Sequence, residues 1–140
     1  PIIFKEVLQF LCQEDSGINF KFFSDRTHNI RGYCGMCNAE DYLKFYNKAK
    51  ASLVHHRDIN RIMDIIISDG NPIVYEDPKK CINDIKDALD KNKKFTVDGY
   101  SKKEILQNNT SYDRAAEIFT KIGLKKVAEE LLRNKNLKLD

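Results

Sequence analysis

Apolar residues along the chain switch between a helical spacing and an alternating one. Positions 3, 4, 7, 8, 10 and 11 are apolar, and this helical spacing predicts a helix over Ile2–Cys12. The next stretch, Ile18–Ser24, alternates apolar and polar residues and predicts a half-buried strand. Ala51–His55 is a short apolar run typical of a strand buried on both faces, and Asn71–Tyr75 predicts a further strand.

Helices are predicted around these strands, each beginning at a residue that caps helices well. The expected caps are Asn38, Asp58, Asp77, Ser101, and either Thr110 or Ser111. Gly70 follows the helix that Asp58 begins, and Gly123 separates the last two helices. Weaker patterns predict short strands at Ile30–Tyr33 and, at an edge of the sheet, Lys93–Val97. We expect Lys135–Asp140 to fray.

This order of elements predicts an α/β fold, a Rossmann-like three-layer α/β/α sandwich with a mostly parallel sheet of about four strands. Residues 1–122 are assigned to the sandwich, without its first strand, and residues 123–140 to a C-terminal helix and tail. Ligands of such sheets bind at the carboxyl ends of the strands, where loops lead into helix N-termini. The loops of interest are therefore Ser24–Cys37, His55–Arg61 and Tyr75–Pro78.

Composition narrows the functional classes without selecting one. The 140 residues are 41% apolar and 32% charged, which is typical of one ordinary soluble domain. The net charge of +3 is too mild to indicate a nucleic-acid or anionic-lipid partner. Apolar runs are far shorter than the ~20 residues of a membrane span, and no signal peptide is evident at the start. We expect no transmembrane segment.

The four cysteines indicate a cytoplasmic protein rather than a secreted disulfide scaffold. Cys34 and Cys37 have the C-x-x-C spacing, which allows a zinc site or a redox pair. Zinc needs two more ligands, and His55, His56 and Cys81 follow in no familiar spacing. A redox pair belongs at a helix N-terminus, which Asn38 supplies. The favoured interpretation is a glycine-containing loop with two small thiols, and no metal is predicted.

His55, His56 and Arg57 form the densest cationic cluster at the end of a predicted strand. Together with Arg61 they could bind a diphosphate, because guanidinium groups contact phosphate oxygens in bidentate fashion. Asp64 follows on the next helix, as a carboxylate beyond this cationic cluster. A coordinating role for the adjacent histidines is disfavoured, since neighbours in a strand point to opposite faces. A polar loop and a solvated helix charge are the alternative interpretations.

Four stretches of the chain, in this order and spacing, carry a family resemblance. They are Ile30–Tyr33, Glu40–Val54, Arg61–Val74 and Ser111–Ala116. They resemble the C-terminal, nucleotide-sugar-binding half of GT-B glycosyltransferases, closest to the glycosyl transferases group 1 and the spore-maturation CgeB-like branch. The sequence departs from the family in having Asp64 instead of glutamate and one extra residue before Gly70. His56 stands where many members have an acid.

The resemblance implies a nucleotide-diphosphate sugar as substrate and no other cofactor. The phosphates would lie by His56, Arg57 and Arg61, and the ribose against Asp64. The base would lie against the backbone around Gly32 and Tyr33. Catalytic residues are unknown and are expected on a separate, upstream acceptor-binding domain, so the chain alone would be half of an enzyme. The alternatives are a non-catalytic Rossmann-like module that binds a nucleotide or a protein, and a Cys34/Cys37 redox or zinc protein.

Overall fold

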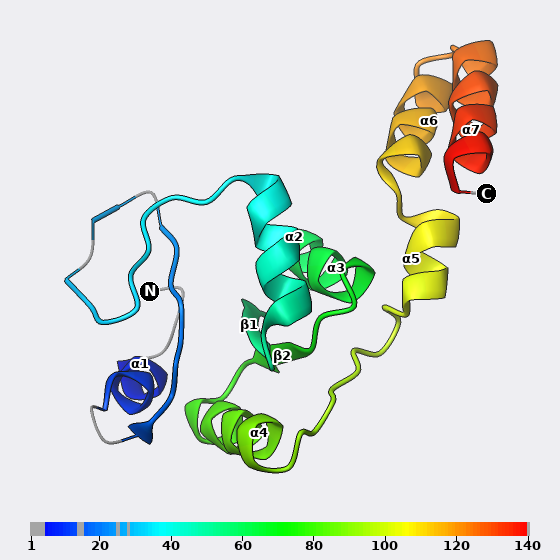
Figure 1. Ribbon diagram of the computed structural model, residues 1–140. Coiled ribbons are helices and arrows are strands. Elements are labelled where there is room, and N and C mark those ends of the chain that lie inside the picture. Colours follow the sequence, from blue (N-terminus) through cyan, green and yellow to red (C-terminus); the bar gives the residue numbers. More distant parts are fainter. Residues whose placement is uncertain (1–4, 14–15, 25, 28, 140) are drawn as a thin grey trace. The chain divides into compact units, whose positions relative to one another are not determined.

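The computed structural model describes residues 5–13, 16–24, 26–27 and 29–139 (Figure 1). The chain divides into two compact units, unit 1 up to Asp98 and unit 2 from Gly99 on. Unit 1 contains α1 (Lys5–Cys12), α2 (Ala39–Lys48), β1 (Ser52–His55), α3 (Ile59–Ile67), β2 (Pro72–Tyr75) and α4 (Pro78–Asp90). Unit 2 contains α5 (Lys102–Asn108), α6 (Ser111–Lys121) and α7 (Lys125–Leu139). None of the helices in the described residues is long and apolar enough to cross a membrane.

Unit 1 is built around the parallel pair β1–β2, which α3 connects (Figure 1). Ser52 pairs with Pro72 and His55 with Tyr75, so both strands end at the same edge. The strands predicted at Ala51–His55 and Asn71–Tyr75 are confirmed, and so is a mixed α/β fold. The sheet that the described residues form has two strands rather than the four expected.

Different helices cover the two faces of the pair. Ile73 and Tyr75 join a core with α1 and α4, whose buried members are Val7, Leu11, Cys81, Ile85 and Ala88. Val54 points to the opposite face because side chains alternate along a strand, and α3 packs there. α3 contributes the buried side chains of Ile62, Met63 and Ile65. Each fully buried aliphatic side chain stabilises the fold by roughly 1.5–3 kcal/mol.

The helices begin where the capping residues predict. Asn38, Asp58 and Asp77 each accept a hydrogen bond from a backbone N–H in the first turn of α2, α3 and α4. Gly70 closes the α3–β2 turn, where an added Cβ would lie 2.8 Å from the Tyr46 carbonyl oxygen. A side chain has no room there, because backbone atoms cannot move aside. The start of the helix expected over Ile2–Cys12 lies outside the described residues.

The strands predicted at Ile18–Ser24 and Ile30–Tyr33 are wrong, although the two segments do run side by side. A single parallel bridge joins Phe22 and Tyr33, with three backbone hydrogen bonds of 2.8–3.0 Å around it. Gly32 has φ +91° and Gly35 has φ +81°, so the backbone leaves the extended conformation on both sides of the bridge. The alternating apolar side chains Ile18, Phe20 and Phe22 are half-buried here without a continuous ladder.

The edge strand predicted at Lys93–Val97 is also wrong. The Phe95 N–H donates to the Asn71 side chain at 2.7 Å instead of to a neighbouring strand. The buried Asn71 amide also donates to the carbonyls of Lys50 and Lys93 at 2.8 and 2.9 Å. The Asn71 side chain thus makes hydrogen bonds in place of a β-ladder and holds the Lys93–Phe95 backbone beside β2.

Unit 2 begins after Asp98, whereas the sequence placed a boundary after residue 122. α6 and α7 pack along each other across the Gly123 turn, so they belong to one unit. α7 continues to Leu139, so the segment expected to fray begins inside this helix, and the fraying itself stays a prediction. Lys135 is only 6% exposed, and its ammonium donates to both carboxylate oxygens of Asp113 and to the Gln107 carbonyl.

Candidate functional site

The carboxyl edge of the parallel pair carries the predicted cationic cluster. β1 ends at His55, and His56 and Arg57 form the exposed turn that leads to α3. The His55 and His56 rings stack with centroids 4.3 Å apart, because His56 lies beyond the strand and no longer alternates with its neighbour. The Arg57 N–H donates to Nδ1 of His55 at 3.2 Å. The turn therefore presents an imidazole and a guanidinium together.

Arg61 is held by side chains of α2 rather than projecting freely from α3. Its guanidinium donates to the Tyr46 hydroxyl at 2.9 Å and lies over the Tyr42 ring at 4.5 Å. Partial burial lowers the pKa of Arg61, but the hydrogen bond with Tyr46 and the contacts with Tyr42 outweigh this and raise it. Asp58 adds an ion pair at 3.8 Å. Arg61 thus packs α3 against α2, which sequence reasoning did not detect.

Asp64 lies on the second turn of α3 and its side chain is exposed. The first turn of the same helix is already capped, because Asp58 accepts the Arg61 N–H at 3.2 Å. Asp77 caps α4 in the same way, accepting the Lys79 N–H at 3.3 Å. Both helices that begin at this edge therefore have a carboxylate at their N-terminus, where a phosphate would otherwise bind. Positive charge for an anion must come from side chains.

Gly32 and Tyr33 lie on the segment that pairs with Phe22, not on β1 or α3. A Cβ on Gly32 would lie 2.6 Å from the Phe20 carbonyl oxygen, so only glycine allows the two backbones to approach. The Tyr33 hydroxyl donates to the Ser24 carbonyl at 3.5 Å. The neighbouring Arg31 donates to the Leu11 carbonyl at 2.7 Å, which ties this segment to the end of α1. The close approach of the two backbones therefore accounts for the glycine at position 32.

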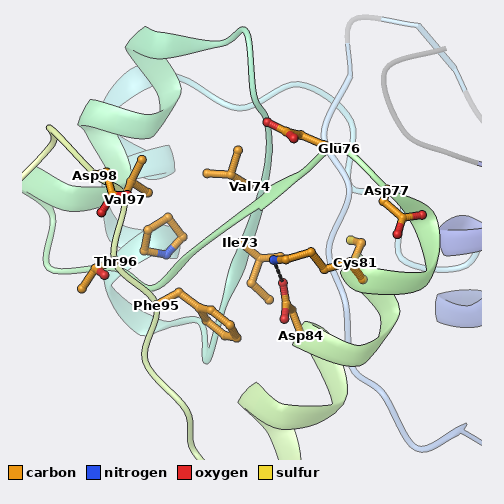
Figure 2. A pocket seen from close by; sticks show the side chains of 12 residues that line it. Ile73, Val74, Glu76, Asp77, Cys81, Asp84, Phe95, Thr96, Val97 and Asp98 are labelled. Carbon is orange, nitrogen blue, oxygen red and sulfur yellow. Dashed lines mark hydrogen bonds and ion pairs between the residues drawn. The ribbon is translucent and has the colours of Figure 1, made fainter.

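A cavity of about 380 Å³ lies beside β2, and none of the residues predicted to bind the nucleotide sugar lines it. Figure 2 shows the side chains that do line it. It is lined by β2, by the first turns of α4 and by the segment that follows α4. The lining residues are Pro72, Ile73, Val74, Glu76, Asp77, Lys80, Cys81, Asp84, Phe95, Thr96, Val97 and Asp98. Sequence reasoning singled out the loop Tyr75–Pro78, whose Glu76 and Asp77 line the cavity, but it did not predict the cavity itself. The edge-strand pattern at Lys93–Val97 was the signal that placed this segment next to β2.

Cys34 and Cys37 are free thiols on the segment before α2. The Cys34 thiol donates to the Gly32 carbonyl at 3.2 Å and the Cys37 thiol to the Asn38 carbonyl at 3.4 Å. Partial burial and the Asp41 carboxylate raise the pKa of Cys37, against a smaller lowering by Arg61. An activated redox cysteine has the opposite shift. Among the described residues, no group of three or more possible ligands could hold a metal ion.

We expect the purified chain to contain no stoichiometric zinc and to react with iodoacetamide at the same rate with or without a chelator. Cys34 should react first because it is exposed. Cys81 should react only after unfolding, since it is buried and burial raises its pKa to about 11. Mass spectrometry of alkylated peptides gives the order, and metal analysis gives the zinc content. One bound zinc per chain, or protection that a chelator removes, would contradict this.

No protein-family model, curated protein or solved structure matches this chain. The functional argument therefore rests on the residues and on the geometry described above.

Proposed function

We propose that the chain is the donor-binding half of a GT-B glycosyltransferase and that it binds a nucleoside-diphosphate sugar at the carboxyl edge of β1–β2. The observation that carries the proposal is the exposed His56–Arg57 turn, placed directly after β1 in a parallel β–α–β unit. This is where ligands of α/β sheets bind. In the proposal, the β1–β2 pair is part of a Rossmann-like three-layer sandwich.

In this proposal His56 and Arg57 bind the diphosphate. Both side chains are exposed, and a guanidinium can contact two phosphate oxygens at once. Arg61 contributes positive charge from α3 while remaining bonded to Tyr46, so its main role is to hold the helix in place. Because Asp58 occupies the N-terminus of α3, the diphosphate is bound from the side of the His56–Arg57 turn.

Asp64 supplies the carboxylate for the ribose hydroxyls, one turn further along α3. A charged acceptor makes stronger hydrogen bonds than a neutral one, which favours the correct orientation of the nucleoside. The base would lie near the Gly32–Tyr33 backbone. The sugar acceptor and the groups that catalyse transfer belong to a separate domain of the enzyme, so this unit alone would bind donor without turnover.

The proposal is tested by titrating the ¹⁵N-labelled full chain with UDP, GDP and ADP and following amide chemical shifts. We expect one nucleotide to shift the amides of residues 55–64. Asp64→Ala and Arg57→Ala should each weaken binding by about 1.5–3 kcal/mol, roughly tenfold to a hundredfold, because each removes a charge-assisted hydrogen bond.

Asp90→Ala is the matched control, because it removes an exposed carboxylate at the end of α4. Its affinity should equal that of the wild type, and circular dichroism should show all variants folded. If no nucleotide shifts residues 55–64, or if Asp64→Ala binds as the wild type does, the donor site is excluded. The function would then fall to the alternative, a module that binds a protein.

A further inference from the structure

Among the residues that the structure describes, no strand pairs with the edge of β2 that faces away from β1. In the described residues β2 pairs with β1 alone, and the Ser52 N–H donates to the Asn71 carbonyl at 2.8 Å. In a parallel ladder alternate residues face the partner, so Ile73 and Tyr75 point their backbone groups at β1. The N–H and C=O of Val74 and the C=O of Pro72 consequently point to the other edge. The missing N–H of Pro72 is tolerated because edge strands do not need it.

The cavity of about 380 Å³ lies along this edge. Asn71 holds Phe95 at the start of β2, and the chain then continues through Thr96, Val97 and Asp98 along the far side of the cavity (Figure 2). The floor is apolar where Ile73 and Phe95 contribute to it. The volume is in the range of sites that bind small molecules or anchoring side chains, about 300–1,000 Å³.

The rim of this cavity favours a positively charged occupant. Four carboxylates line it, and the one ammonium among its described lining residues, that of Lys80, is already paired with Asp84 at 2.9 Å. Asp77 is engaged in capping α4. Glu76 and Asp98 remain exposed at the rim. Pairing β2 with the β2 of a second copy is disfavoured, because it would bring two rims of like charge together.

We propose that the open edge of β2 docks an extended basic segment of a partner protein by strand addition. The Val74 N–H and C=O and the Pro72 C=O supply the main-chain hydrogen bonds. Alternate side chains of the segment would enter the cavity above Ile73 and Phe95, and the intervening lysine or arginine side chains would reach Glu76 and Asp98. This surface runs along the side of β2 and is distinct from the proposed donor site, which lies at the carboxyl ends of β1 and β2.

The test uses fluorescein-labelled, end-capped heptapeptides of alternating valine and lysine, measured by anisotropy with the full chain. We expect saturable binding that weakens with added salt. A valine–glutamate peptide should bind at least about tenfold more weakly, and so should a lysine peptide whose central valine is proline, since proline removes a donor. Hydrogen exchange of the Val74 amide should slow by about tenfold or more when the lysine peptide binds.

Glu76→Gln with Asp98→Asn should weaken binding about tenfold, while Asp90→Asn, another exposed carboxylate, should leave it unchanged. Strand addition would be overturned if the proline peptide bound as tightly as the uninterrupted lysine peptide. It would also be overturned if the lysine peptide left the exchange rate of the Val74 amide unaltered. Protection of Val74 by self-association without peptide, with dimer seen by ultracentrifugation, would assign the edge to a second copy and also overturn it. Failure of nucleotide binding does not bear on any of these results.

Discussion

Replacing Lys135 with methionine is expected to lower the free energy of unfolding of unit 2 by about 2–4 kcal/mol. Methionine preserves the length and apolar stem of the side chain, so the loss reports the ammonium group. In the wild type that ammonium lies 2.7 and 2.8 Å from the Asp113 oxygens and 2.6 Å from the Gln107 carbonyl. Removing it leaves the Gln107 carbonyl without its donor and the Asp113 carboxylate with its Thr110 donors alone, which is the costly way to break a largely buried pair.

The measurement is urea denaturation followed by circular dichroism, together with hydrogen exchange of amides in α6 and α7. Lys125→Met is the matched control, because Lys125 is exposed on the same helix and should change stability little. Lys135→Met combined with Asp113→Asn should recover part of the loss, since the buried charge is removed with its partner. Equal stability of Lys135→Met and Lys125→Met would contradict a role for the ion pair.

The same pair predicts how unit 2 responds to acid. Partial burial raises the pKa of Asp113, but hydrogen bonds from Lys135 and Thr110 outweigh this and lower it overall. A carboxyl group with a lower pKa in the folded state stabilises the fold above its unfolded pKa, about 3.9. This stability is lost as the pH falls from that value through the folded pKa. Lys135→Met should therefore lose less stability than the wild type below about pH 4.

Replacing Asn71 with alanine is expected to destabilise unit 1 by about 2–4 kcal/mol. The buried amide makes three hydrogen bonds, to the backbone of Lys50, Lys93 and Phe95. Alanine leaves two carbonyls and one N–H without partners and opens a small space beside β2. Denaturation of the full chain measures the loss of stability. Faster hydrogen exchange of the Phe95 amide, which loses its acceptor, shows where the loss occurs.

Asn47→Ala is the control for Asn71→Ala. Its side-chain amide also donates to a backbone carbonyl, that of Ser68 at 2.9 Å, but Asn47 is exposed and water can replace it. We expect a loss below about 1 kcal/mol. If both substitutions cost the same, the buried hydrogen-bond network at Asn71 does not hold the strand start and the following segment together.

Sequence patterns predicted the elements whose signals are local. Asn38, Asp58 and Asp77 cap helices as their positions indicate, because a cap depends on residues two or three positions away. The strands of the β1–β2 pair were evident as apolar runs between helices. Strand pairing itself depends on distant partners, which explains why Ile18–Ser24 has the strand alternation but only one bridge.

Long-range polar contacts carried no sequence signal. Lys135 belongs to a segment that the sequence predicts to fray, and its partner Asp113 lies 22 positions earlier in the capping turn of α6. Arg61 looked like a phosphate ligand, yet Tyr46 on another helix holds it. The type of each residue predicted the interactions it can make, whereas the residue it contacts depends on how the helices pack. The donor-site assignment of His56, Arg57 and Asp64 stays a prediction.

The bond between Lys135 and Asp113 also sets an order for folding during synthesis. A ribosome has added every residue of unit 1 well before it reaches Lys135. Unit 1 can therefore fold while the chain is still growing, whereas the N-terminal turn of α6 waits for the third turn of α7 to supply its cation. A nascent chain paused between Asp113 and Lys135 would have the sequence of α6 without the cation that its first turn binds.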